Sequence, residues 1–510
     1  MRKAITALAV TLGLGGCAVG PDYEPPEVDL PEDWPEHSLL ADEEREAWQD
    51  WWQRFDDPTL DQLVERAAAD NLDIRLQAAR LQEARARLGL ARAEQMPTVD
   101  LQAEAARDRP SAAAQRGLPE GFEPGTGTEN LFSLSGVLGY EVDLFGRLAR
   151  SREAAEALLL ESVFSQDAVR LNVIADVVAT YFDLRTAQRQ LEITERTLES
   201  REETYELEQV RYEAGETDEL TLRQAQAELE TTRAEIPLRR ERVQTLEGVL
   251  GVLVGMSPSE LMAYDDMDLG ERTSLMDISL PEEVPGLLPS ELLERRPDVR
   301  AAEAEVMAAT AGIGVAEADR LPRLNLAALM GTAATDVSDL FSSAAETWSV
   351  GASVAGPLFD FGRGRAGVET AEALAEQART RYLATVTIAF NEVRDALMLY
   401  QTSGERVQAI RDQVAAVERT LDLAELRYGE GFIGFIEVLD AQRALLAAEL
   451  ALAEAVRDRL NATATLFKAL GGGWEYPPSA TEEAFSREGS EAPEGDDQTV
   501  RLAGSNRADG

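Results

Sequence analysis

Cysteine, histidine and lysine are nearly absent from this chain of 510 residues. Cys17 and His37 are the only residues of their kinds, and Lys3 and Lys468 are the only lysines. One Cys and one His exclude intramolecular disulfides and zinc sites made of several Cys and His ligands, and they leave a single combination for a Cys–His nucleophile pair. His37 lies in an arm rich in Pro and Glu and has no companion ligands, so we interpret it as a surface residue. An enzyme made from this sequence would have to use carboxylates alone.

Positive charge and long hydrophobic runs are scarce as well. The chain has 49 Lys and Arg against 94 Asp and Glu, a formal net charge of −45. Nucleic acid is therefore excluded as an obvious partner, because a phosphate backbone requires a basic footprint. The 44% of hydrophobic residues still suffices for an ordered protein. No stretch after residue 17 has the ~20 mainly apolar residues of a membrane-spanning helix, so other membrane contact must come from strands or surface.

The N-terminus has the pattern of a bacterial lipoprotein. An apolar run over 4–16 follows two basic residues, and it fits the core of a secretory signal better than a membrane span. Small residues then precede Cys17, so we expect a signal peptide over 1–16 and lipid on the Cys17 sulfur. A plain secreted protein with an incidental Cys is the alternative. Ala18 follows rather than Asp, which by resemblance to lipoprotein sorting rules favours delivery to the outer membrane.

The sequence repeats itself at a nearly constant offset, which predicts two tandem copies of one structural unit. The offset is 216 residues in the later part of each copy and 225 in the earlier part. The extra residues of the first copy fall in a Pro/Gly-rich stretch, 110–127, which predicts an enlarged loop. The matches at 216 are Arg211-Tyr212-x-x-Gly215 with Arg427-Tyr428-x-x-Gly431 and Phe145-Gly146-Arg147 with Phe361-Gly362-Arg363, and that at 225 is Asp73-x-Arg75 with Asp298-x-Arg300.

Each copy contains a long helical stretch with the spacing of a coiled coil. Apolar residues recur every three or four positions without Pro or Gly from 147 to 214, so the helix would reach roughly 100 Å. A Gly follows in each copy, and the apolar spacing then resumes, which predicts long helical hairpins over 147–252 and 363–470. Shorter helices are expected at about 58–94 and 297–320, each ending before a Pro.

Four segments alternate apolar and polar residues with the period of a strand, and we predict strands at about 98–107, 131–142, 323–333 and 347–358. Strands of roughly ten residues with one apolar face suit a transmembrane barrel. Because about eight strands are the practical minimum for closure, several chains would have to contribute. Two hairpins in a soluble sandwich are the alternative.

Several short motifs are distinctive as a set. They are Cys17-Ala-Val-Gly-Pro21-Asp-Tyr23, Trp51-Trp52-x-x-Phe55-x-Asp57-Pro58, Asn71-Leu72-Asp73, Tyr140-Glu-Val-Asp-Leu-Phe-Gly-Arg147 and Arg295-Arg296-Pro297-Asp298-Val299. With them the chain resembles the TolC-like outer-membrane factors, and more narrowly the lipoprotein branch that serves resistance-nodulation-division (RND) efflux pumps. The likeness runs from Cys17 to about Trp474. It implies an α+β fold in which three chains form a 12-stranded transmembrane β-barrel, four strands per chain, that continues into a coiled-coil α-helical barrel in the periplasm.

The resemblance implies a passive exit duct of the outer membrane that reaches into the periplasm. Its expected partners are two further copies of itself, a periplasmic adaptor, an inner-membrane RND pump and outer-membrane lipid, with no cofactor, no metal site and no catalysis. A conduit for secreted protein and a lipid-anchored periplasmic coiled-coil scaffold are the alternatives. The expected segments are a signal peptide (1–16), a lipidated arm (17–57), a first repeat (58–284), a second repeat (285–474) and a disordered acidic tail (475–510).

In the family the duct closes at its periplasmic end, where acidic side chains surround the pore. The matching residues are Glu437 and Asp440, which lie three apart and can share one face of a helix. In a trimer they would give six carboxylates and a field that favours cations. A solvated charged face is the alternative.

The resemblance also predicts roles for the residues around this ring. The position of Tyr428 implies polar contacts between helices, although a core aromatic is an equal alternative. Where some members have a basic latch residue this chain has Ile433, so we expect an apolar plug of Phe432, Ile433 and Phe435 in its place.

The hairpin turns are the expected contact points for the adaptor. They comprise Ala214 and Gly215 in the first copy and Gly431 and Gly434 in the second. Glycines at such positions can simply end helices. Asp57, which precedes Pro58, is interpreted as a helix cap and not as half of an acid–base pair.

Overall fold

The computed structural model describes residues 18–31, 50–109, 127–263, 273–281 and 289–472. The expected signal peptide, Cys17, His37, most of the enlarged loop and the tail after 474 lie outside the described residues. We refer below to 58–284 and 285–474 as the first and second halves of the chain.

Two helices precede the first strand, α2 (Pro58–Asp70) and α3 (Leu72–Glu94), after the short 3-10 helix η2 (Trp51–Phe55). Asp57 caps α2, since its Oδ1 accepts from the backbone N–H of Thr59 at 2.9 Å. The expected helical region 58–94 is interrupted at Asn71. The Asn71 Oδ1 accepts from the backbone N–H of Asp73 at 2.8 Å, and this cap starts α3 in a new direction.

The four strands form one antiparallel sheet in the order β1-β2-β3-β4. Their bounds are β1 Thr98–Asp108, β2 Glu129–Val142, β3 Arg323–Ala334 and β4 Glu346–Ala355, with 3-10 turns η3 (Val337–Asp339) and η4 (Ser343–Ala345) between the last two. The pairing of β2 with β3 joins the two halves of the chain.

The register collects the apolar residues of all four strands on one face. Leu138 of β2 pairs with Val99 on one side and with Ala328 on the other, and Ala328 pairs in turn with Val350. Neighbouring rows repeat the pattern, so one face is apolar across the whole sheet while the other carries Ser, Gly, Asn, Asp and Glu as well as a few apolar residues. Every residue of β4 is exposed in the single chain.

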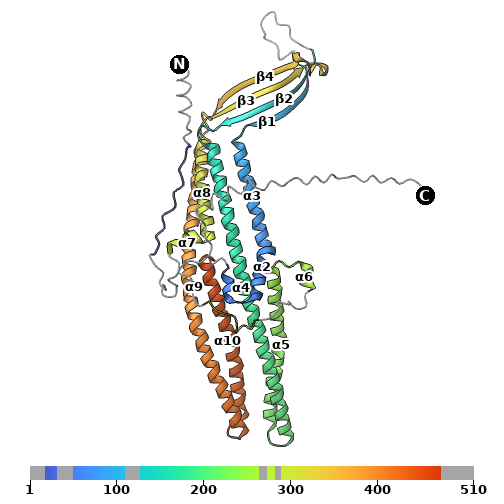
Figure 1. Ribbon diagram of the computed structural model, residues 1–510, viewed down its shortest axis with the longest axis vertical. Coiled ribbons are helices and arrows are strands. Elements are labelled where there is room, and N and C mark those ends of the chain that lie inside the picture. The colour runs from blue at the N-terminus through green and yellow to red at the C-terminus, as the bar shows by residue number, and fades with distance from the viewer. Residues whose placement is uncertain (1–17, 32–49, 110–126, 264–272, 282–288, 473–510) are drawn as a thin grey trace, which may run out of the picture. The chain divides into compact units, whose positions relative to one another are not determined.

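Two long helical hairpins follow the two pairs of strands (Figure 1). The helices α4 (Arg147–Glu213) and α9 (Arg363–Gly429) have 67 residues each, and α5 (Glu219–Leu253) and α10 (Phe435–Ala469) have 35 each. The remaining helices are α6 (Pro258–Met262), α7 (Pro289–Arg295) and α8 (Pro297–Ala318). No helix among the described residues is both long and apolar enough to cross a membrane.

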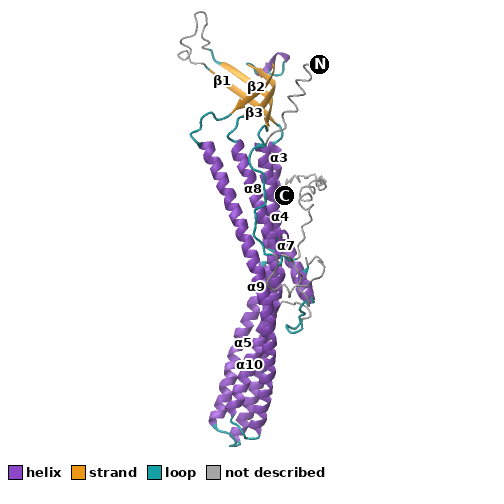
Figure 2. Ribbon diagram, turned by 90° about the vertical axis from the view of Figure 1, so that its left-hand side faces the viewer, coloured by secondary structure: helices purple, strands orange, loops and turns teal. Residues whose placement is uncertain are grey.

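The helices pack side by side in one layer, with the sheet near one end and the hairpin turns at the other (Figure 2). Near the sheet the order is α3, α4, α8, α9, and near the turns it is α5, α4, α10, α9. Helix α4 is therefore interior along its whole length, whereas α9 is an edge. The main core lies between these levels, where Trp51 stacks on Phe467 with ring centroids 5.6 Å apart and Phe55 meets Phe182 at 5.0 Å.

Candidate functional site at the hairpin turns

Both long helices end in the same way at the turns. After α4, the backbone N–H of Glu216 donates to Arg211 O at 2.8 Å, and Gly215 adopts a φ of 79°. After α9, Phe432 N–H donates to Arg427 O at 2.9 Å, and Gly431 has a φ of 75°. These bonds are those of a Schellman ending, which requires a left-handed residue that glycine adopts without strain. Both glycines therefore end helices, and both are exposed together with Ala214 and Gly434.

A small apolar core fills the space behind the turn of the second hairpin. Phe435 is 5% exposed, and its ring centroid lies 5.4 Å from that of Tyr428. Ala225 of α5 and Val438 of α10 are buried in the same cluster. The expectation that Phe435 forms part of an apolar plug is wrong, because its side chain lies inside the chain's own core. Phe432, by contrast, is 78% exposed.

Tyr428 also makes a polar contact that links the two hairpins. Its hydroxyl donates to Glu208 Oε2 at 3.0 Å, and Arg211 donates to the other oxygen of Glu208 at 3.0 Å. Glu208 is 1% exposed, so this carboxylate is buried and held by both donors. Burial and the nearby negative charge of Glu208 raise the pKa of Tyr428, which keeps its hydroxyl a donor. Tyr428 is thus both a core aromatic and a polar bridge between α9 and α4.

A second buried carboxylate, Glu228 of α5, links three helices. Arg201 of α4 lies 3.1 Å from Glu228 Oε2, and Arg443 of α10 donates from Nε to Oε1 at 2.9 Å. Arg201 also donates to Thr232 Oγ1. Because Glu228 and Arg201 are both buried, their charges depend on each other for compensation. We refer to Glu208, Tyr428, Glu228, Arg201 and Arg443 as the hairpin clamp.

The two acidic residues predicted to ring the pore lie next to this clamp. Glu437 and Asp440 are both exposed in the first two turns of α10. Asp440 accepts from Arg443 at 3.2 Å, so the arginine that binds Glu228 also reaches this carboxylate. Ile433 lies half-buried between the exposed Phe432 and Gly434. The structure therefore brings the predicted gate residues together at one end of the molecule.

Sequence reasoning missed Glu208, Glu228 and Arg201. In a coiled coil a charged residue is expected to face solvent, so none of the three stood out. The repeat contained a usable signal: at the offset of 216, Glu208 corresponds to Ala424, Glu228 to Ala444 and Arg201 to Val417. A charge in one copy where the other has a small apolar residue marks a contact that only one copy makes.

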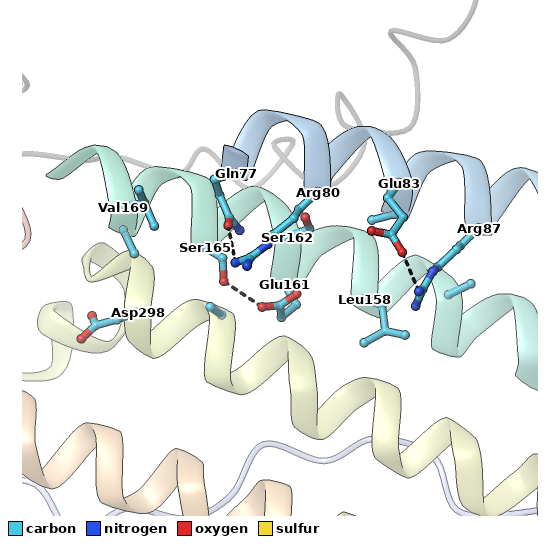
Figure 3. Close-up of a pocket in the computed structure, with 14 residues that line it drawn as sticks. Gln77, Arg80, Glu83, Arg87, Leu158, Glu161, Ser162, Ser165, Val169 and Asp298 are labelled. Carbon is cyan, nitrogen blue, oxygen red and sulfur yellow. Dashed lines mark hydrogen bonds and ion pairs between the residues drawn. The ribbon is translucent and has the colours of Figure 1, made fainter. Parts of the chain in front are cut away.

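A cavity of about 610 Å³ lies elsewhere, between α3, α4 and α8 (Figure 3). Its charged and polar groups form bonds within their own helices: Arg87 donates to Glu83 at 2.6 Å and Ser165 to Glu161 at 2.7 Å. No group of three or more His, Cys, Asp or Glu in the described ranges is placed to hold a metal ion. The cavity is thus a polar part of the helical wall, and we place the candidate site at the hairpin turns.

Comparisons with known proteins agree on one family. The model of the family "Outer membrane efflux protein" matches residues 63–255 and 288–472. The solvent efflux pump outer membrane protein SrpC of Pseudomonas putida is 34% identical over 481 residues, which cover 92% of this chain and 98% of that protein. The structure of the outer-membrane channel OprN has a TM-score of 0.81 at 33% identity and covers 90% of this chain and 100% of its own. The outer membrane channel CmeC of Campylobacter jejuni has a TM-score of 0.84 at 25% identity, with coverages of 92% and 98%.

Proposed function

Since this chain belongs to the outer membrane efflux protein family, we propose that three copies of it form the exit duct of a tripartite efflux system. The chain is an efflux channel component of the outer membrane that extends into the periplasm. Its family is one of channels and not of enzymes. The relatives named above are efflux proteins, which favours efflux of small molecules over the alternatives of protein secretion and a periplasmic scaffold.

The open edges of the single chain support the trimer. Strands β1 and β4 are the two ends of the sheet, and each leaves one side without a strand partner in the described chain. An exposed edge is a template for pairing with another chain. Three sheets joined β4 to β1 would give the 12-stranded barrel, with the apolar face toward lipid and the opposite face toward the pore. The tandem repeat is supported by the equal lengths of α4 and α9 and of α5 and α10.

We place the periplasmic gate at the hairpin turns. Threefold symmetry would bring Glu437 and Asp440 of three chains around one axis, and six carboxylates there would favour cations. Phe432 and Ile433 are the remaining candidates for an apolar constriction. The hairpin clamp would hold the two hairpins of each chain together as the gate opens.

The exposed turns are our candidates for contact with the periplasmic adaptor, which would connect the duct to an inner-membrane RND pump. Ala214, Gly215, Gly431 and Gly434 provide exposed backbone there. At the other end, lipid on Cys17 would anchor the chain to the outer membrane. The division into an arm, two repeats and an acidic tail follows the same proposal.

The single observation that carries the proposal is the sheet with one apolar face and two open edges, joined to helices whose turns gather the acidic residues. The test is conductance in a planar bilayer, with the lipidated mature protein compared with a Glu437→Ala plus Asp440→Ala variant. We expect small, cation-selective steps whose selectivity weakens in the variant. Equal selectivity in both proteins would show that the gate lies elsewhere. If both proteins fold and neither conducts, the proposal that the chain forms a duct is wrong.

A further inference from the structure

An extended segment near the N-terminus lies on the seam between the two halves of the chain. We call residues 18–23 the strap. The backbone N–H of Val19 donates to Phe145 O, at the end of the β2–α4 connection, at 3.1 Å. The Tyr23 hydroxyl donates to Glu303 Oε1 on α8 at 3.0 Å. The strap thus contacts α4 of the first half and α8 of the second half, close to where the sheet gives way to helices.

Three glycines allow the strap to approach the helices closely. A Cβ at Gly146 would lie 2.7 Å from the Cβ of Ala18, and a Cβ at Gly314 would lie 2.8 Å from Val19 O. A Cβ at Gly20 would lie 2.4 Å from the Cα of Gly314, and Gly20 has a φ of 95°. Each of these positions therefore requires glycine for steric reasons. Gly146 and Gly314 thus form a notch that fits the strap, and Gly20 is the strap residue that lies against Gly314.

A buried arginine binds the strap, mainly through the backbone carbonyl groups of the strap. The Arg150 side chain is 7% exposed, and it donates to Val19 O at 3.2 Å, to Gly20 O at 3.3 Å and to Asp22 Oδ1 at 2.7 Å. Glu153 on the same helix accepts a further bond at 2.8 Å. A guanidinium buried in this way needs acceptors for its N–H groups, and the strap supplies three of them. Without the strap, Arg150 would keep only Glu153 among these partners.

The positions related to this notch by the repeat, on α9 of the second half and α3 of the first, do not form a second notch among the described residues. At the offset of 216, Arg150 corresponds to Ala366. At the offset of 225, Gly314 corresponds to Gly89, which has nothing within 4 Å of its Cβ position. Within the described ranges, the seat for the strap therefore occurs once. Arg150 and the close approach at Gly314 distinguish this seam from the equivalent face on α9 and α3.

We infer that Gly146, Arg150 and Gly314 form a receptor for the strap, which fixes where the lipid on Cys17 meets the membrane and fastens the two halves at that level. The inference rests on the proposed lipidation. Ala18, to which Cys17 is directly bonded, lies against Gly146 at the β2–α4 connection. A strap held at Ala18 would therefore keep the lipid attachment close to the channel wall.

Two matched pairs of variants test the inference in the purified, lipidated channel. Gly314→Ala places a methyl group 2.8 Å from Val19 O and 2.8 Å from Arg150 Cγ, so it crowds both sides of the seat. Its control, Gly312→Ala, changes the same helix at a position with nothing within 4 Å. Arg150→Met removes the donors and keeps an apolar stem, and its control is Arg152→Met, whose side chain is 47% exposed on the same helix. Circular dichroism confirms that each protein keeps its helices.

The readout is hydrogen exchange at the Val19 amide, with the amides of α8 as the internal reference. We expect Gly314→Ala and Arg150→Met to speed exchange at Val19 by at least about tenfold and both controls to leave it unchanged. Wild-type protection in either folded test variant would overturn the inference. Hydrogen exchange is measured independently of transport, so the two proposals can fail separately. Unchanged exchange at Val19 in the test variants together with normal conductance would overturn the strap receptor and support the duct. The expected faster exchange in a channel that never conducts would support the receptor and overturn the duct.

Discussion

The two halves of the chain have helices of the same lengths but occupy different places in the fold. Helix α4 contacts α3, α5, α8 and α10, whereas α9, with the same 67 residues, packs mainly on α8 and α10. The same difference holds for strands, because β2 lies between two neighbours and β4 has one. Equal patterns of apolar residues thus give an interior element in one half and an edge in the other.

The edge position of α9 leaves apolar surface uncovered in the single chain. The coiled-coil seam of α9 faces its own chain, where Leu421 packs on the core behind the second turn. Leu374, Ile388 and Met398 on the same helix are exposed. In the proposed trimer another copy would cover this surface.

The hairpin clamp extends the comparison to polar contacts. Glu208 and Glu228 lie in the first half and receive Tyr428 and Arg443 from the second half. The reverse set is missing, since the counterparts of the two glutamates are Ala424 and Ala444. In the proposed trimer the equivalent faces of two chains would meet without these carboxylates. We therefore expect the proposed gate to open between chains while the two hairpins of each chain stay joined.

Removal of the buried Glu228 carboxylate should have the largest effect on the contacts that only the first half supplies to the hairpin clamp. Glu228→Ala leaves buried Arg201 without its ion-pair partner, and we expect a loss of about 3–5 kcal/mol in the stability of the tip. Hydrogen exchange of the α5 and α10 amides measures it. Glu230→Ala is the control, because its side chain is 55% exposed and its ion pair with Arg233 is worth less than about 1 kcal/mol. Similar losses in both variants would contradict a buried clamp.

A charge on the edge strand tests whether the exposed surface of the second half faces lipid. Val350→Arg puts a cation on the apolar face of β4, where we expect a cost of about 2–4 kcal/mol if it lies near the bilayer midplane. Ser349→Arg places the same charge on the opposite face and should cost far less. The yield of heat-resistant trimers in outer membranes measures both, and equal yields would argue against the barrel.

The two equivalent tyrosines sharpen the comparison of the hairpins. Tyr428→Phe removes the donor to buried Glu208 and should cost about 1–3 kcal/mol at the tip, whereas Tyr212→Phe, at a side chain 40% exposed, should cost close to nothing. The raised pKa of Tyr428 means that its contribution is full below about pH 10 and declines as pH rises through the pKa of the folded state. Exchange rates of the α10 amides at pH 7 and at alkaline pH, corrected for intrinsic exchange, check both statements.

The smallest effect is expected at Asp61 in α2 of the first half. Burial and the neighbouring carboxylates Asp57 and Glu65 raise the pKa of Asp61. A raised carboxyl pKa penalises the charged form in the folded state, so Asp61→Asn should stabilise the protein by less than about 1 kcal/mol at pH 7. The gain should shrink as pH falls through the raised pKa and vanish below about 3.9. Thermal unfolding across this range measures it, and a gain independent of pH would point to another cause.

The repeating patterns of the sequence were enough to locate the strands and the long helices. The structure has strands at Thr98–Asp108 and Arg323–Ala334, where alternation predicts 98–107 and 323–333, and helices from Arg147 and Arg363 as expected. The register places the alternating apolar residues on one face of the sheet. Side chains alternate between the two faces of a strand and recur on one face of a coiled-coil helix about every 3.5 residues. An apolar face of either element therefore leaves its period in the sequence.

The contacts between distant segments were not visible in this way. Glu208 and Arg150 are charged residues on helices, and only the packing of another segment against them shows that they are buried. Phe435 follows the turn and was expected in the plug, yet the fold of the second hairpin turns it into the chain's own core. Burial of a single side chain depends on tertiary pairing, which no local period encodes.

The two open edges of the sheet put correct assembly in competition with pairing to foreign strands. A folded single chain presents unpaired N–H and C=O groups on β1 and β4, and these groups pair with any available strand. In the proposed trimer, closure by three copies would depend steeply on chain concentration, whereas capture by a foreign strand would depend on how long the edges stay open. Cells that make too little of this chain should therefore lose functional duct faster than they lose protein.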